Sequence, residues 1–255
     1  ASIGIAVAPG DGESGVDLLK HADLALYRAK REGKSHYHFF EPSLDEQARA
    51  RRELELDLWI AIKDGHFELY FQPLYSLNKN KLEGFEALIR WNHPKRGMVS
   101  PAEFIPLAEE TGLIHQVGDW VVREACRAAR DWPDELSVAV NISPKQFAAP
   151  GLASTILQAL SNSGLQPHRL ELEITESVFI ADIEKTLGTL HSLRNLGVRI
   201  ALDDFGTGYS SLSYLRSFPF DKVKIDQSFV RDLNDNTNNA HAIIRAITAL
   251  ASALG

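Results

Sequence analysis

Hydrophobic and polar residues alternate with a period of two along five short segments of the chain. In residues 137–142, Val138, Val140 and Ile142 form an apolar set, and the residues between them form a small or polar set. The same alternation recurs in the same sense at residues 85–91, 170–175, 199–203 and 222–226. Because successive side chains of a strand point to opposite faces, the pattern predicts five strands with one apolar and one polar face each.

The spacing of the segments predicts how the strands are connected. Two β-like runs, 67–77 and 82–91, are separated by four residues, which is too few for a crossover helix and predicts an antiparallel hairpin. After the hairpin, strands alternate with helix-like stretches in βα units of roughly 30 residues, which is typical of parallel strands covered by helices. The expected helices lie near residues 102–110, 114–131, 152–163, 183–196, 210–217 and 239–254.

The polar faces of these strands need a common interior, because the apolar faces meet the helices. A closed or nearly closed barrel supplies it, with the polar side chains converging on its axis. Barrels of this kind carry their chemistry at the carboxyl ends of the strands. The polar residues in the last part of each strand are Glu86, Asn141, Glu173, Asp203 and Lys224.

This predicted cluster places several carboxylates and the adjacent Asp204 around one lysine. Two like charges about 4 Å apart repel by about 4 kcal/mol at an effective dielectric near 20, so the cluster either takes up protons or binds a cation. Oxygen ligands that include an amide favour Mg²⁺ or Mn²⁺. A zinc site is disfavoured because no histidine lies at a strand end and Cys126 lies on a helix.

Alternative interpretations of the same residues stay open. Glu171, Glu173, Arg199 and Lys222 can form an ion-pair network that only fills the axis, because buried charges are usually paired. Lys224 can be a Schiff-base nucleophile, although neighbouring carboxylates keep a lysine protonated and favour phosphate binding. The glycines at 206–208 can cradle a phosphate, but they are better explained as a sharp loop over the mouth of the barrel.

The first 63 residues are predicted to be separate from the barrel. Residues 2–8 are strand-like and residues 16–31 helix-like, which together are too few to bury a core. In residues 42–63, Leu54, Leu58 and Ile62 recur at the spacing of an amphipathic helix. We therefore divide the chain into residues 1–40, a linker helix at 41–63, and the barrel at 64–255.

Composition narrows the class of protein. The chain is 44% hydrophobic and 24% charged, and it has no apolar run of the roughly 18–20 residues that a membrane span needs, so this segment is expected not to contact a membrane. The net charge of −7 argues against DNA or RNA as a partner. A single cysteine suits a reducing, cytoplasmic compartment.

The two ends of the sequence predict a fragment of a longer protein. The chain begins at Ala1, has its only methionine at Met98, and has a predicted helix that stops at Gly255; the other parts of the longer protein can include an upstream membrane anchor.

Six motifs in order identify the chain as a member of the EAL domain family, the bacterial phosphodiesterases that hydrolyse cyclic di-GMP. They are EALIRW (86–91), HPKRGMVSPAEFIPLAEETGLI (93–114), NISPKQF (141–147), ELEITES (171–177), DDFGTGYSSLSYL (203–215) and KIDQSFV (224–230). The resemblance covers about Leu54 to Gly255. Residues 1–40 resemble the end of a GGDEF, diguanylate cyclase-like domain through SIGIA (2–6) and ADLALYRAKREGKSHYHFF (22–40), without its GGDEF signature.

The resemblance implies a (β/α)₈ TIM-like barrel with an antiparallel first strand, of which about six of eight strands are present here. It implies two divalent ions, Mg²⁺ or Mn²⁺, and a cyclic di-GMP substrate. Lys224 would contact the attacking water and the phosphate, Arg90 the other phosphate, and Gln72 the substrate. Glu176 would anchor the loop after Asp204 and support a homodimer. The ligands implied for the first ion are Glu86, Asn141, Glu173 and Asp203, and those for the second are Asp203 and Asp204.

The implied activity is two-metal hydrolysis of cyclic di-GMP to linear pGpG. A further acidic ligand of the second metal is expected beyond Gly255, so we expect residues 1–255 to be inactive by themselves. The alternative is a degenerate EAL domain that binds cyclic di-GMP or a protein partner without turnover. Degenerate members lose one or more of the residues named above, and this chain retains all of them, which favours the enzyme.

Overall fold

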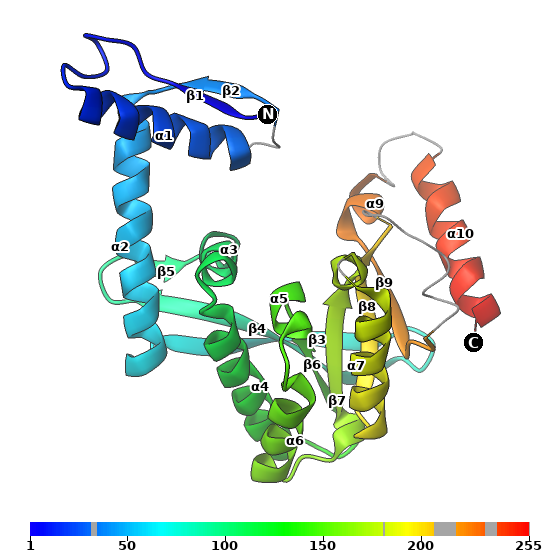
Figure 1. The fold of residues 1–255 in the computed structure, drawn as a ribbon. Helices are drawn as coiled ribbons and strands as arrows, with labels where there is room; N and C mark the ends of the chain where they lie inside the picture. The colour runs from blue at the N-terminus through cyan, green and yellow to red at the C-terminus, as the bar shows by residue number, and fades with distance from the viewer. Residues whose placement is uncertain (32–34, 181, 207–217, 233–238, 255) are drawn as a thin grey trace. The chain divides into compact units, whose positions relative to one another are not determined.

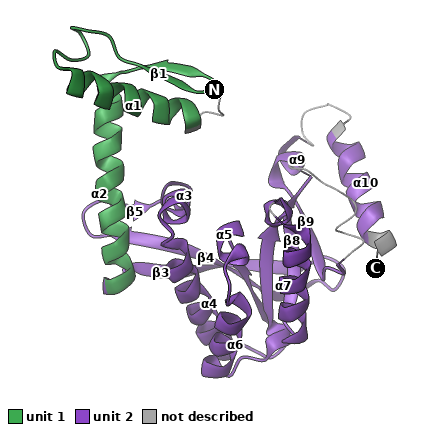
Figure 2. Cartoon of the chain, in the orientation of Figure 1, with its two compact units in different colours: residues 1–63 green, residues 64–255 purple. Residues whose placement is uncertain are grey.

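The computed structural model describes residues 1–31, 35–180, 182–206, 218–232 and 239–254. These residues form two compact units, residues 1–63 and residues 64–255, coloured separately in Figure 2. Each unit has its own secondary structure (Figure 1). The division into a GGDEF-like remnant, a linker helix and a barrel domain stays a prediction.

The first unit is built on a pair of short parallel strands, β1 (Ile3–Ile5) and β2 (Tyr37–Phe39). Helix α1 (Gly15–Arg31) connects them, and α2 (Pro42–Asp64) follows. Gly4 allows α1 to lie against β1, since a Cβ at this position would be 2.0 Å from the carbonyl oxygen of Ala22. The first strand and both helices agree with the sequence prediction, whereas β2 was not predicted.

The second unit contains one sheet of seven strands. These are β3 (Phe67–Ser76), β4 (Lys81–His93), β5 (Gly97–Val99), β6 (Ser137–Asn141), β7 (Leu170–Thr175), β8 (Arg199–Phe205) and β9 (Lys222–Ile225). Their order is β3-β4-β6-β7-β8-β9, with β5 on β4. The expected hairpin is present, because β3 and β4 are antiparallel and every later pair along this order is parallel. Among the described residues β3 and β9 do not pair, so the sheet is an open barrel.

Helices follow the strands of the second unit at the expected places. They are α3 (Pro101–Thr111), α4 (Ile114–Arg130), α5 (Pro144–Ala148), α6 (Leu152–Ser163), α7 (Ile183–Asn195), α9 (Gln227–Arg231) and α10 (Asn239–Leu254), with 3-10 turns η1 (Pro167–Arg169) and η2 (Glu176–Phe179). The short elements α5, α9 and β5 were not expected. The helix expected at 210–217 lies outside the described residues. No helix in the part of the chain that the structure describes is both long and apolar enough to cross a bilayer.

The core has the apolar faces that the alternation predicts. Val138, Val140, Leu172 and Leu202 are fully buried on their strands. At the hairpin, an aromatic cluster supports β4: the ring of Trp91 lies 5.5 Å from that of Phe104 and 6.0 Å from that of Phe67, centroid to centroid. Burial of three large rings near the end of β4 fixes this strand and the polar side chains of its other face.

A buried arginine lies at the amino-terminal ends of strands β6 and β7. Arg169, at the end of η1, donates hydrogen bonds to the carbonyl oxygens of Leu136 (2.9 Å), Ala129 (2.7 Å) and Trp132 (3.2 Å). These carbonyls belong to the last turn of α4 and the loop that leads to β6. The guanidinium thus satisfies backbone acceptors that have no partner within the helix.

Replacement of Arg169 by methionine should therefore destabilise the protein. The variant keeps an unbranched side chain but removes the donor that these carbonyls share, although that of Ala129 keeps the N–H of Trp132 at 3.1 Å. The loss should lower the free energy of unfolding by about 3 kcal/mol. Urea unfolding followed by circular dichroism measures this difference. The control is Arg127→Met on α4, where the exposed arginine pairs with Glu124 and the loss should stay below about 1 kcal/mol. Equal losses in the two variants would contradict the role of Arg169.

Candidate functional site

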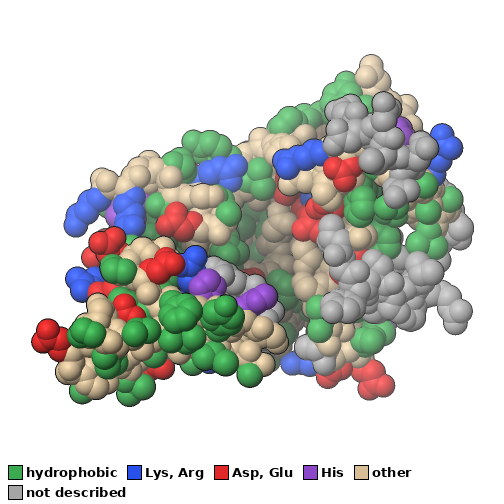
Figure 3. All heavy atoms as spheres, turned by 90° about the horizontal axis from the view of Figure 1, so that it is seen from above, with side chains coloured by type: hydrophobic (Ala, Val, Ile, Leu, Met, Phe, Trp, Pro, Cys, Tyr) green, Lys and Arg blue, Asp and Glu red, His purple; other side chains and the backbone are tan. Residues whose placement is uncertain are grey.

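Four of the predicted site residues meet at the carboxyl ends of the strands, around the ammonium group of Lys224. This group, on β9, lies 2.7 Å from a carboxylate oxygen of Glu173 on β7 and 2.9 Å from one of Asp203 on β8. A carboxylate oxygen of Glu86 on β4 is 3.4 Å away. Acidic side chains gather near the centre of the face seen in Figure 3, next to basic ones.

The strand register explains why long polar side chains fit on this axis. Ala139 is the register partner of Glu86, and Ala201 is the register partner of Glu173. Both alanines are fully buried. Because register partners in neighbouring strands point to the same face, a small side chain beside each glutamate leaves the space that its carboxylate occupies.

The amide predicted to be a ligand joins the same cluster. Asn141 is the register partner of Glu173, and its Nδ2 donates a 2.8 Å hydrogen bond to Oε1 of Glu86. The amide therefore orients one oxygen of Glu86 while the other oxygen faces Lys224. Its own side-chain oxygen lies at the same end of the barrel as the carboxylates.

A bulge in β8 explains the two adjacent aspartates. The register joins Leu202 to Val223 and then Phe205 to Ile225, so Asp203 and Asp204 together stand opposite one residue of β9, Lys224. Asp204 has a φ of 53°, in the left-handed region, and its N–H donates to the side chain of Asp203 at 2.9 Å. A regular strand would turn Asp204 to the opposite face, whereas the bulge keeps it near the mouth.

Burial and like charges set the protonation of the cluster. Burial raises the pKa of Glu173 to about 7; Lys224 opposes this shift, while Glu86 and Asp203 add to it. Burial alone would lower the pKa of Lys224, but the carboxylates of Glu173 and Asp203 raise it above its ordinary value. Lys224 is therefore a permanent cation, which disfavours the Schiff-base alternative.

One oxygen of the cluster has no hydrogen-bond partner among the residues that the structure describes. Oε1 of Glu173 is buried and unpaired, although a buried carboxylate oxygen normally accepts a hydrogen bond or binds a cation. Carboxylates and an amide are also the donors that Mg²⁺ and Mn²⁺ prefer. The residues fit a divalent ion chemically, although in the described ranges no three His, Cys, Asp or Glu side chains are already arranged as a metal site.

The second polar layer of the axis corresponds to the alternative interpretation in part. Glu171 is buried, with Lys222 at 2.6 Å and Arg199 at 3.9 Å from its carboxylate oxygens. These three residues form the expected ion-pair network. Glu173, which that interpretation assigned to the same network, instead faces Lys224. The axis therefore holds two layers: an ion-pair network around Glu171 and, nearer the carboxyl ends of the strands, the candidate site.

The remaining predicted residues lie around this cluster. Gln72 on β3 is exposed and is the register partner of Glu86. Arg90 lies four residues after Glu86 on β4, on the same face of the strand. Its guanidinium is 5.2 Å from the ring centroid of Tyr70. Glu176 is buried, and its Oε1 accepts a 2.8 Å hydrogen bond from the N–H of Gly206, where the loop after β8 begins. Residues 207 and 208 of that loop lie outside the described residues.

A pocket that the sequence analysis missed lies beside the cluster. It has a volume of about 310 Å³ and is lined by Arg90, Asn141 and Thr175 together with apolar residues of α3 and α4 such as Ile105 and Val117. Two predicted site residues thus contribute to its wall. The motif at 93–114 carries part of the apolar lining, including Ile105 and Ile114, but its pattern alone could not be distinguished from ordinary helix packing.

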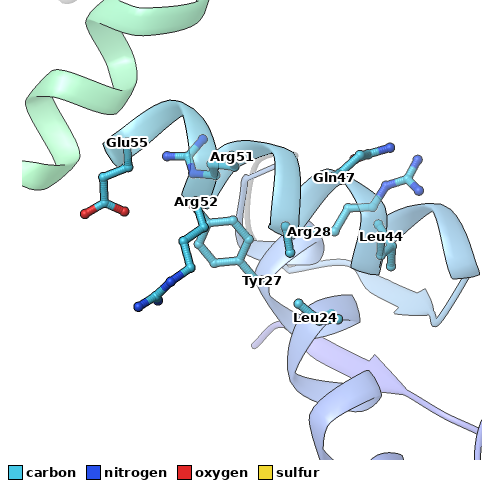
Figure 4. Close-up of a pocket in the computed structure, with 9 residues that line it drawn as sticks. Leu24, Tyr27, Arg28, Leu44, Gln47, Arg51, Arg52 and Glu55 are labelled. Carbon is cyan, nitrogen blue, oxygen red and sulfur yellow. The ribbon is translucent and has the colours of Figure 1, made fainter. Parts of the chain in front are cut away.

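A larger pocket in the first unit is less suited to chemistry. Figure 4 shows it between α1 and α2, with a volume of about 610 Å³ and three arginines in its lining. Arg28 is paired with Glu41 at 3.2 Å, and Arg51 lies 5.9 Å from the ring centroid of Tyr27. Their guanidinium groups point in different directions in this view, so they do not converge on one ligand atom.

Comparison with known proteins identifies the family. Residues 55–255 match the EAL domain, and residues 1–36 match the family described as "Diguanylate cyclase, GGDEF domain". The chain belongs to the EAL domain family. The resemblance stated from the sequence motifs is therefore confirmed, and the GGDEF match accounts for the first unit up to residue 36.

Relatives of this EAL domain chain include named cyclic di-GMP enzymes. The bifunctional diguanylate cyclase/cyclic di-GMP phosphodiesterase MucR of Pseudomonas aeruginosa is 44% identical over 258 residues, which cover 100% of this chain and 38% of MucR. The cyclic di-GMP phosphodiesterase PdeR of Escherichia coli is 37% identical over 99% of this chain and 38% of its own length. The chain thus spans about a third of the length of the curated relatives it matches.

Solved EAL structures have the same fold. The PaMucR phosphodiesterase in a cyclic di-GMP complex has a TM-score of 0.76 and 43% identity, covering 79% of this chain and 83% of that one. The FimX EAL domain from Pseudomonas aeruginosa bound to cyclic di-GMP has a TM-score of 0.69 and 28% identity, covering 76% and 78%. The predicted TIM-like barrel fold is therefore confirmed.

Removal of the central ammonium should destabilise the site in a pH-dependent way. In Lys224→Met the carboxylates lose their cation, which should lower the free energy of unfolding by about 3 kcal/mol near pH 8 in the presence of a chelator. A carboxyl whose pKa is raised in the folded state loses stability as the pH rises through that pKa, so the loss should shrink towards about pH 5. Urea unfolding at both pH values measures it.

The control for this variant is Lys79→Met. Lys79 forms an exposed ion pair with Glu83 at 3.1 Å, so its replacement should cost less than about 1 kcal/mol at either pH. A Lys224→Met loss that is no larger than this, or that grows as the pH falls, would contradict the arrangement of charges described above.

Proposed function

We propose that this chain is the phosphodiesterase part of a protein that hydrolyses cyclic di-GMP to linear pGpG. The observation that carries the proposal is the convergence of Glu86, Asn141, Glu173 and Asp203 around Lys224, with Asp204 held beside them by the bulge. The proposal is supported by relatives named as cyclic di-GMP phosphodiesterases. It is also supported by the likeness to the MucR phosphodiesterase in its cyclic di-GMP complex.

Two divalent ions, Mg²⁺ or Mn²⁺, are part of this proposal. Glu86, Asn141, Glu173 and Asp203 would hold the first ion, and Asp203 with Asp204 would hold the second. When bound, such ions would polarise a phosphate oxygen and lower the pKa of a water molecule. Oε1 of Glu173, which is buried and has no partner in the described part of the chain, is an oxygen that such a cation would satisfy.

The side chains of this chain would bind and orient the phosphates. Lys224, which stays protonated, would donate hydrogen bonds to the reacting phosphate and to the attacking water rather than accept a proton. The Arg90 guanidinium would bind the other phosphate through paired donors, and Gln72 would contact the substrate from the neighbouring strand. In the reaction a water oxygen bonds to phosphorus, one phosphoester bond breaks, and the departing sugar oxygen takes up a proton.

Glu176 would act as a positioning residue. Its hydrogen bond to the N–H of Gly206 would fix the start of the loop that follows the two aspartates. Gly206 has a φ of 100°, and a Cβ there would lie 2.9 Å from the ring of Phe229, so a side chain would disturb this turn. We further propose that the domain acts in the bacterial cytoplasm, as a homodimer that this loop supports.

A binding module is the second candidate. An EAL domain that binds cyclic di-GMP without cleaving it would use the same pocket beside Arg90 and Asn141. The retained carboxylates favour hydrolysis, because a receptor needs the phosphate-binding groups but not a set of acidic side chains around one lysine.

The decisive experiment compares two glutamates of strand β4. In a longer chain that carries the remaining strands, Glu86→Ala should lower the rate of pGpG formation in Mg²⁺ or Mn²⁺ by about a hundredfold or more, the scale of losing one electrostatic stabiliser of a transition state. The control is Glu83→Ala, which removes a carboxylate that pairs with Lys79 and should leave the rate unchanged. Full activity in Glu86→Ala would contradict the assignment of Glu86 as a metal ligand. Binding of cyclic di-GMP without turnover in the unaltered chain would favour the receptor.

Residues 1–255 by themselves are expected to release little or no pGpG. The resemblance implies one further acidic ligand of the second ion outside residues 1–255, so the ion set would be incomplete. The measurement is the initial rate of residues 1–255 against that of the longer chain at equal concentration. Similar rates would contradict this expectation while leaving the proposed reaction intact.

A further inference from the structure

A strip of exposed apolar side chains runs along the second half of α2. Leu56, Trp59 and Ile60 are 62%, 47% and 41% exposed, whereas Leu54 and Leu58, on the opposite side of the same helix, are buried. The spacing i, i+3, i+4 places the three exposed residues on one face. We call Leu56, Trp59 and Ile60 the α2 strip. Helix α2 therefore has an uncovered apolar face in addition to its buried one.

Charged residues close both ends of this strip. Arg52 and Glu53 lie one turn before Leu56, and Lys63 and Asp64 lie one turn after Trp59 and Ile60. The Lys63 ammonium lies 3.5 Å from the ring centroid of Trp59, which holds it at the end of the strip. Each end thus carries one basic and one acidic residue, at a separation of about 15 Å for a rise of 1.5 Å per residue.

The order of these charges is self-complementary under a two-fold axis. Glu53 and Lys63 are equally far from Leu58 along the helix, on opposite sides, and so are Leu56 and Ile60. Two copies of α2 that cross antiparallel near Leu58 would place each Glu53 beside the other copy's Lys63. The same operation would place each Leu56 against the other copy's Ile60.

We propose that the α2 strip is a contact between two copies of this chain, in which the α2 helices pack antiparallel. An isologous contact requires one surface to complement itself, and the sequence of charges on this face does so. A parallel arrangement would instead bring Glu53 to Glu53 and Lys63 to Lys63, and like charges in contact disfavour association. The contact is independent of the proposed reaction, because none of its residues belongs to the candidate site.

The size of the strip sets the strength of the contact. A few turns of helix bury less than the roughly 1,200 Å² that stable complexes need, so the contact alone should give a weak, reversible dimer. The tryptophan is the residue on which most of the affinity should depend, since buried aromatic side chains dominate small interfaces. An anionic membrane surface fits the strip less well, because Glu53 and Asp64 flank it together with the basic residues.

Sedimentation of residues 1–255 over roughly 10–200 µM tests the contact. The chain should show a monomer–dimer equilibrium, and Trp59→Glu and Leu56→Glu should each raise its Kd by about tenfold or more. The control is Leu157→Glu on α6, where the leucine is 53% exposed outside the strip, and its Kd should equal that of the unaltered chain. A chain that stays monomeric throughout, or a dimer that neither strip variant weakens, overturns the proposal.

A charge exchange tests the antiparallel geometry and the identity of the partner. Glu53→Lys and Lys63→Glu should each raise the Kd by about fivefold or more, since each creates two like-charge contacts in the dimer. The double variant Glu53→Lys, Lys63→Glu restores both contacts and should return the Kd to within about threefold of the unaltered value. Failure of the double variant to recover, in chains that circular dichroism shows to be folded, overturns the proposal.

Cross-linking adds a measurement that does not depend on affinity. The only cysteine, Cys126, is buried, so an introduced surface cysteine is the reactive one. A mixture of Glu53→Cys and Lys63→Cys chains should form a disulfide-linked dimer on oxidation, while either chain alone should not. Equal cross-linking of Glu53→Cys alone would overturn the antiparallel arrangement. Binding to phosphatidylserine vesicles that is lost in Trp59→Glu would overturn it in favour of a membrane.

Discussion

The attraction between the Lys224 ammonium and three surrounding carboxylates is the interaction on which the interior of this domain depends. Four strands contribute one charged side chain each, and a single cation holds their ends together. A barrel axis filled with apolar side chains would not need it, but here the polar faces of the strands point towards one another across the axis. The same charged side chains therefore fill the barrel axis and form the candidate functional site.

The two small residues Ala139 and Ala201 and the bulge in β8 make this cluster possible. The alanines leave space beside Glu86 and Glu173, and the bulge gives β8 two acidic side chains opposite one lysine. Without the bulge, strict alternation would send Asp204 into the layer of helices, where a charge without a partner is costly. The left-handed backbone of Asp204 is thus a local cost that keeps both aspartates at one end of the barrel.

The sequence predicted the parts of this structure that repeat and missed those that occur once. Alternation over 137–142, 170–175 and 199–203 was enough to place the strands and their polar face, because every strand supports the same conclusion. The strands β2 and β5 and the helices α5 and α9 are three to five residues long, too short to show a period. The contacts of Arg169 and the bulge at Asp204 depend on tertiary partners far apart in sequence, which periodicity does not reveal.

The charge of the cluster also determines the order in which ligands can bind to it. Glu86, Glu173, Asp203 and Asp204 carry more negative charge than Lys224 neutralises, and the protein as a whole has a net charge of −7. A phosphate approaching this end of the barrel would be repelled by the carboxylates unless protons or cations offset them. Burial already pushes Glu173 towards its protonated form near pH 7, even though Lys224 opposes this shift. Under the proposed function, an anionic dinucleotide would therefore bind well only after divalent cations have bound, so its affinity would follow their concentration.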